Sequence, residues 1–174
     1  MGGMRALVLA LACAASGWAA AGASSAAKDS PETRQLKTWL SELHRSNEVS
    51  MQLGRLAARR GDSGPVRRFG DRVERDHRDG DHRLFKLARR RGVDVEELEP
   101  DAEQELAIQR LRALNGPDFD RLFADVMARE QQRQEQALRR AEANSDVKRL
   151  ASQLLPLARQ NEELARYLQR KAGR

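Results

Sequence analysis

Residues 66–87 read VRRFGDRVERDHRDGDHRLFKL, and this stretch decides the fold. Its apolar and small residues recur at steps of three and four, which is the spacing of one face of an α-helix. Charged residues fill most of the other positions, as on the solvent side of an amphipathic helix. We therefore predict a long helix that ends near Gly92 and buries one stripe of residues, namely Val66, Phe69, Val73, His77, Gly80, Leu84 and Leu87.

Three further long stripes flank this helix in the sequence. The first follows Ser30-Pro31, a hydroxyl cap with proline at the first helical position, and ends at the break over residues 61–65. The other two follow residues 116–117 and 144–146. The stripes are Leu36, Leu40, Leu43, Asn47, Ser50, Gly54 and Ala57; then Phe119, Leu122, Val126, Glu130, Gln134, Ala137 and Ala141; then Val147, Leu150, Leu154, Leu157, Asn161, Leu164 and Leu168.

These stripes predict an all-α, ferritin-like four-helix bundle over residues 31–171. The longer connection between the second and third helices suits a crossover, and Asp101 with Gln104 indicates a capping box for a short helix through Leu114. Pro156 lies inside the last helix and should kink it. The composition agrees, because 33% of the residues are charged and only 4% are aromatic, too few for a sheet protein.

The N-terminal residues are typical of an export signal. Arg5 supplies a positive start, residues 6–15 form a short apolar run, and Ala-x-Ala sites follow. We predict a signal peptide over residues 1–27, cleaved between 21 and 27, then a linker over 28–30, and no transmembrane span in the mature protein. The expected location is the periplasm or the cell envelope. Lipid anchoring at Cys13, the one cysteine of the chain, is the alternative.

Each stripe turns polar near its centre, and these positions should form one buried polar layer. The residues are Asn47, Ser50, His77, Glu130 and Asn161. One interpretation is a hydrogen-bonded cluster in which His77 pairs with Glu130 and the amides and the hydroxyl complete the network. The other interpretation is a metal site.

The metal interpretation rests on Glu74-x-x-His77, which matches the Glu-x-x-His pattern of di-iron bundles. The candidate ligands for a divalent transition metal are Glu48, Glu74, His77 and Glu130. Asn161 and Ser50 stand where further ligands would be needed, and neutral amides and hydroxyls are poor ligands for transition metals. We therefore expect no cofactor and keep a metal-binding or oxidase-like protein as the alternative.

Several short motifs together resemble one protein family. They are Asn47, Leu53-Gly54-x-Leu56-Ala57, Phe69 before Val73-x-x-Asp76-His77, Leu114-Asn115-Gly116 with Phe119-Asp120, and Leu154-Leu155-Pro156. Over about residues 36–168 the chain is similar to exported bacterial proteins catalogued as a domain of unknown function, often labelled outer membrane proteins and regarded as ferritin-like. The resemblance implies a helical bundle, export and a metal role for the central layer. The family's usual Glu and two His residues fall here at Ser50, Glu130 and Asn161, which implies a degenerate metal site.

The chain is basic, with a formal net charge of +6, and much of the excess lies in the helix after Pro65. An alternative function is therefore an anionic-surface (lipid) binder that uses Arg67, Arg68, Arg72, Arg89, Arg90 and Arg91. Acids at four-residue spacing should pair with neighbouring arginines, and stacking aromatics are scarce, so nucleic acid is not an expected partner. His82 should face solvent, and His44 with Glu48 should form a surface pair one turn apart.

Motifs of catalysis are missing from the sequence. We find no Gly-rich phosphate loop, no Gly-x-Ser-x-Gly elbow, no His-Glu-x-x-His helix and no serine–histidine–acid arrangement. The leading hypothesis is therefore a non-catalytic binding or scaffolding protein of the cell envelope. The sequence does not indicate its partner.

Overall fold

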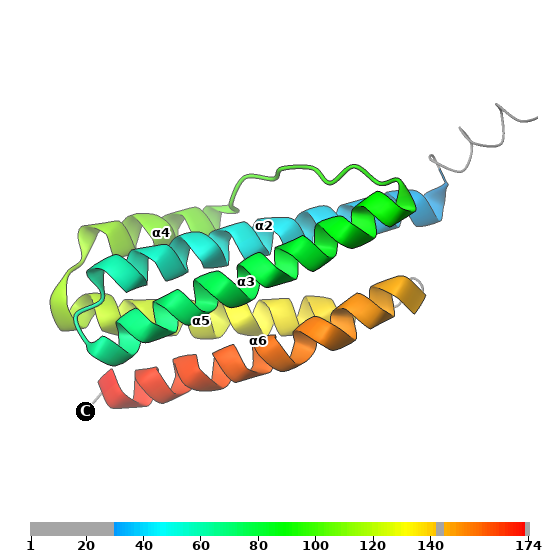
Figure 1. Ribbon diagram of the computed structural model, residues 1–174. Helices are drawn as coiled ribbons and strands as arrows, with labels where there is room; N and C mark the ends of the chain where they lie inside the picture. Colours follow the sequence, from blue (N-terminus) through cyan, green and yellow to red (C-terminus); the bar gives the residue numbers. More distant parts are fainter. Residues whose placement is uncertain (1–29, 142–144, 173–174) are drawn as a thin grey trace, which may run out of the picture.

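The computed structural model describes residues 30–141 and 145–172, which form five helices and no strand (Figure 1). The four long helices pack as a bundle, and the short helix lies on the long crossover beside it. The predicted all-α, ferritin-like arrangement is therefore confirmed. The helices are α2 (Pro31–Arg60), α3 (Gly64–Arg91), α4 (Ala102–Ala113), α5 (Gly116–Arg139) and α6 (Ser145–Ala172). The predicted signal peptide, its cleavage region, Cys13 and all of the predicted linker except Ser30 fall within residues 1–29, outside the described residues.

The helix boundaries follow the capping signals of the sequence. The Ser30 hydroxyl accepts a hydrogen bond from the Thr33 N–H at 3.1 Å, and Ser63 does the same for Val66 at 3.3 Å. Asp101 and Gln104 form the predicted capping box at the start of α4. The helix α3 ends at Gly92, whose φ of 61° is in the left-handed region that glycine adopts without strain. The helix α6 continues through Pro156.

The chain folds as two hairpins, α2 with α3 and α5 with α6, that pack against each other. Within the first hairpin the helices approach so closely that two glycines face each other. A Cβ atom built on Gly54 would lie 2.7 Å from the Gly70 carbonyl oxygen, and one on Gly70 would lie 2.6 Å from the Gly54 carbonyl oxygen. This contact fixes the antiparallel register of α2 and α3.

Two apolar clusters fill the bundle, one toward each end. On α2 the first cluster includes Val49 and Leu53, and the second includes Leu36, Leu40 and Leu43. Between them, polar side chains from all four long helices are buried. The predicted polar layer thus separates the two cores, and its members Asn47, Ser50, His77, Glu130 and Asn161 are each at most 4% exposed.

The predicted stripe of α5 needs a correction. Leu122 is only half-buried and Ala137 is exposed, whereas Phe123, Met127 and Gln131 are completely buried. The other five predicted positions are buried, but the centre of the buried face is rotated toward Phe123, because Phe119 and Phe123 both enter the core and stack with their ring centroids 6.2 Å apart. This rotation brings Gln131 into the centre of the bundle.

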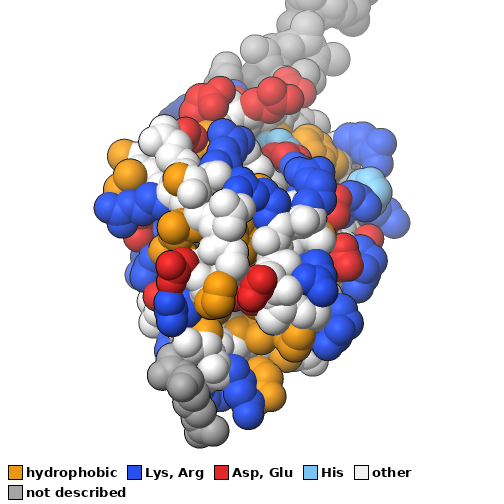
Figure 2. All heavy atoms as spheres, turned by 90° about the vertical axis from the view of Figure 1, so that its left-hand side faces the viewer, with side chains coloured by type: hydrophobic (Ala, Val, Ile, Leu, Met, Phe, Trp, Pro, Cys, Tyr) orange, Lys and Arg blue, Asp and Glu red, His pale blue; other side chains and the backbone are white. Residues whose placement is uncertain are grey.

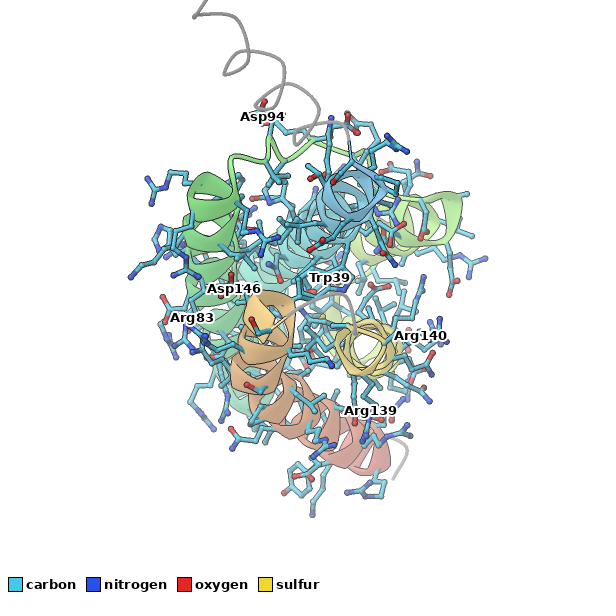
Figure 3. All side chains as sticks on the ribbon, turned by 90° about the vertical axis from the view of Figure 1, so that its right-hand side faces the viewer. Trp39, Arg83, Asp94, Arg139, Arg140 and Asp146 are labelled. Carbon is cyan, nitrogen blue, oxygen red and sulfur yellow. The ribbon has the colours of Figure 1, made fainter. Side chains whose placement is uncertain are left out.

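The crossover over residues 92–101 runs along the outer side of the α2–α3 hairpin. Figure 3 shows Asp94 of this segment on the side away from α5 and α6. The crossover is held by a hydrogen bond from the Glu96 N–H to the Ser41 hydroxyl at 2.9 Å and by a Lys37–Glu96 ion pair at 2.6 Å. At the same end of the bundle, Trp39 lies between α2 and α5 and donates to the Ala137 carbonyl at 3.4 Å. None of the helices in the described ranges is long and apolar enough to cross a membrane.

Candidate functional site

His77 is at the centre of the buried polar layer, and neutral amides surround it. Its Nδ1 lies 3.1 Å from Asn47 Oδ1, and its Nε2 lies 3.0 Å from Gln131 Nε2. Gln134 Nε2 donates to the same Asn47 oxygen at 3.1 Å. These contacts assign the neutral tautomer in which His77 Nδ1 donates to Asn47 and Nε2 accepts from Gln131.

The protonation of His77 agrees with this network. Burial lowers the pKa of His77 from 6.5 to about 4, and the negative charge of Asp76 opposes part of that shift. The imidazole is therefore neutral near neutral pH.

The predicted hydrogen bond between His77 and Glu130 is not formed. Glu130 instead accepts from Gln104 Nε2 at 3.1 Å and pairs with Arg133 at 3.1 Å. Burial raises the pKa of the Glu130 carboxyl, while the Gln104 hydrogen bond and the Arg133 charge act in the opposite direction. The rotation of α5 explains the difference, because it puts Gln131 rather than Glu130 next to His77.

The four predicted metal ligands do not converge either. Glu74 forms ion pairs with Arg78 and, at 3.8 Å, with Arg55. Glu48 is exposed at the surface of α2, whereas His77 and Glu130 are buried. The predicted ligand set of Glu48, Glu74, His77 and Glu130 is thus spread over several environments.

A different group of potential ligands forms next to the polar layer. His44 Nδ1 lies 2.8 Å from Asp81 Oδ1, and one ligand atom each from His44, Glu48 and Asp81 lie within 4.8 Å of one another. His44 is only 8% exposed, so the predicted surface pair with Glu48 needs correction: the close partner of His44 is Asp81 on α3. The rings of Phe85 and His44 pack in a T-shaped arrangement with their centroids 5.0 Å apart. His82, in contrast, is exposed, as predicted.

A hydrogen-bond chain joins this group to the buried layer. Gln131 donates to His77, His77 donates to Asn47, and Asn47 Nδ2 donates to Asp81 Oδ1 at 3.3 Å. All donors point the same way, toward the carboxylate that also accepts from His44. The buried layer thus orients Asp81 from behind, in the manner of the outer-shell partners of metal ligands.

The group lies in a polar groove on the outer side of the hairpin, with a volume of about 940 Å³. The floor is α2 from His44 to Arg59, one wall is α3, and the other is formed by the crossover and α4. Charged residues line most of it: Arg45, Glu48, Arg55, Arg59, Asp81, Glu97, Glu99, Glu105 and Arg112. Its size is in the range of small-molecule sites.

The six arginines predicted to form an anionic-surface site are divided between the two ends of α3, roughly 30 Å apart at the rise of an α-helix. Arg67 donates to the carbonyls of Gly61 and Asp62, Arg72 pairs with Asp76, and Arg91 pairs with Glu32 and Asp146. Of the six, Arg68, Arg89 and Arg90 have neither an ion pair nor a side-chain hydrogen bond within the described ranges, and Arg67 has only its two bonds to backbone carbonyls. Figure 2 shows the end where α3 begins, with lysines and arginines interspersed among acids and apolar side chains.

The lowered pKa of His77 predicts that the stability of the protein depends on pH. The His77 imidazole takes up a proton near pH 6.5 in the unfolded state but only near pH 4 in the folded state. The free energy of unfolding therefore decreases as the pH falls through this window. We expect the free energy of unfolding to drop by about 3 kcal/mol between pH 7 and pH 4 from this residue. Urea unfolding at several pH values measures it. His77→Gln should lose this component, whereas His82→Gln should keep it.

The comparisons with known proteins agree with this fold. The family model described as "Domain of unknown function (DUF4142)" matches residues 20–168. The comparison with curated proteins gives no match. Among solved structures, the chain is similar to "Crystal structure of DUF305 fragment from Deinococcus radiodurans", with a TM-score of 0.70 and 17% identity, over 83% of this chain and 97% of that chain. An identity this low shows a common fold alone. The family model covers most of the chain, and the protein therefore belongs to the DUF4142 family.

Proposed function

We propose that this protein is an exported, non-catalytic binding protein of the cell envelope that holds a divalent transition-metal ion between His44, Glu48 and Asp81. The observation that carries the proposal is the approach of these three side chains to within 4.8 Å at the floor of an open polar groove. Ligands about 2.1 Å from one ion are roughly 3 to 3.5 Å from each other. Glu48 is the exposed member of the three, so the movement needed to complete the set is assigned to its side chain.

The ligand types favour zinc, manganese or iron. One imidazole with two carboxylates is a borderline-to-hard donor set without thiolate, and three protein ligands leave coordination positions open toward the groove. The support behind Asp81 strengthens the proposal, since Asn47 and the buried His77 orient this carboxylate. Location in the envelope follows from the predicted signal peptide.

Calorimetric titration of chelator-treated protein with Zn²⁺ tests the proposal. We expect one ion per chain, with binding that weakens as the pH falls because protons compete with the metal ion for its ligands. Glu48→Gln should lower the Zn²⁺ affinity by at least about tenfold. Glu97→Gln removes the same charge from the facing wall of the groove and should change the affinity much less.

Two results would contradict the proposal. One is a stoichiometry near zero for Zn²⁺, Mn²⁺ and Fe²⁺ alike. The other is an equal loss of affinity in Glu48→Gln and Glu97→Gln, which would mean that the groove only attracts cations by its charge. Metal-dependent turnover of a redox substrate by the purified protein would contradict the non-catalytic part.

A further inference from the structure

We propose that the groove binds its metal ion together with a small anion, a carboxylate or a phosphate, that takes an open position on the ion and is held by Arg45. This inference rests on the proposed metal site. It adds the class of the second ligand and the residue that recognises it.

Arg45 precedes Glu48 by three residues, which makes the two neighbours on the surface of α2, and it lines the groove together with Glu48 and His44. Its side chain forms no ion pair within the described residues, and its Nε atom is buried without a hydrogen-bond acceptor. A buried guanidinium nitrogen without an acceptor is energetically unfavourable. An anionic oxygen from a ligand in the groove supplies the acceptor that the chain does not.

The charges along the groove make anion binding depend on the metal. Four arginines and five carboxylates line it, and together they give the lining a net charge of −1. A bound divalent ion changes this to +1. The empty groove should therefore repel a small anion, and the metal-loaded groove should attract it.

The rest of the groove has the size and the charges for a ligand larger than one ion. Arg55 and Arg59 continue the floor away from Glu48, over roughly 10 to 16 Å at the rise of an α-helix. Arg59 and Arg112 have no ion pair among the described residues, and Arg55 has one at 3.8 Å. An anion with a second acidic group, such as a dicarboxylate, could extend from the metal toward these arginines.

Titration of the Co²⁺-loaded protein tests the inference, because the visible absorption of Co²⁺ reports a new ligand on the ion. Inorganic phosphate and succinate are added in separate arms, with a thermal melt to show that each variant is folded. In the wild type we expect a saturable spectral change with at least one anion, and a rise of roughly tenfold in Co²⁺ affinity at saturation. The arm that responds identifies phosphate or carboxylate.

Arg45→Gln should bind Co²⁺ in anion-free buffer at least as tightly as the wild type, because a positive charge near the ion is removed, and it should lose the anion effect. Arg45→Lys should retain part of the effect, and Arg90→Gln, at an exposed arginine outside the groove, should behave as the wild type. Failure of Co²⁺ to bind at all would contradict the metal site itself. Binding of Co²⁺ with no response to either anion, or an unchanged response in Arg45→Gln, would overturn the inference and leave the metal site standing.

Discussion

Gly70→Ala should lower the free energy of unfolding by about 3 to 5 kcal/mol, although alanine is the better helix former by about 1 kcal/mol. The added Cβ would lie 2.6 Å from both the Ala58 nitrogen and the Gly54 carbonyl oxygen, and 2.9 Å from the Ala57 Cβ. Two of these atoms are backbone, so no rotamer change relieves the contact. The helices α2 and α3 must separate, which loosens both cores. Urea unfolding followed by far-UV circular dichroism measures the loss.

Gly80→Ala is the matched control, because it makes the same change on the same helix. Its Cβ would lie 3.4 Å from Leu154 Cδ2 and 3.9 Å from the Asn47 amide, which is ordinary packing distance. We expect it to be neutral or to stabilise the protein by up to about 1 kcal/mol. Similar shifts for both variants would mean that the close approach of the two backbones does not limit the fold.

The stripes of α2 and α3 could be predicted because each contains one unambiguous apolar face. The position of the turn between α2 and α3 also determines which of their residues face each other. Gly54 and Gly70 are equally far along the chain from Asp62, and so are Asn47 and His77. A tight turn centred there pairs these residues across an antiparallel hairpin. About one helical turn farther from it, His44 lies close to Asp81.

The stripe of α5 could not be chosen from the sequence alone. Its first half contains apolar residues on two overlapping faces, and its second half offers glutamines, which are common on surfaces. Only the packing of Phe119 and Phe123 decides which face turns inward. For this reason the sequence predicts Glu130 as the partner of His77 and does not identify Gln131.

The candidate site depends on tertiary structure that periodicity does not contain. Asp81 lies next to Gly80 on the edge of its stripe, where a charged residue is usually solvated. Asp81 belongs to a site only because the crossover covers that edge and forms the groove with α2, and periodicity does not predict this arrangement. The pairing of an off-stripe histidine with an off-stripe acid on the neighbouring helix was the signal that could have found it.

Asn47→Ala is the second variant for which we expect a large effect, a loss of about 3 to 5 kcal/mol in the free energy of unfolding. Asn47 accepts from His77 and Gln134 and donates to Asp81, and it is only 1% exposed. Its removal leaves two buried donors without an acceptor, at about 1 to 3 kcal/mol each, and adds a cavity. Chemical unfolding of the metal-free protein measures this loss.

Ser50→Ala is its control on the same buried face of α2. Ser50 is also 1% exposed, but its hydroxyl oxygen has no hydrogen-bond partner among the described residues, so removing it should cost less than about 1 kcal/mol. The two variants should also differ in Zn²⁺ affinity. Asn47→Ala frees the Asp81 carboxylate to rotate and should weaken binding by about 10- to 100-fold, whereas Ser50→Ala should leave it unchanged. A stability loss in Asn47→Ala without a loss of Zn²⁺ affinity would contradict this link. It would mean that the buried layer stabilises the bundle but does not orient Asp81.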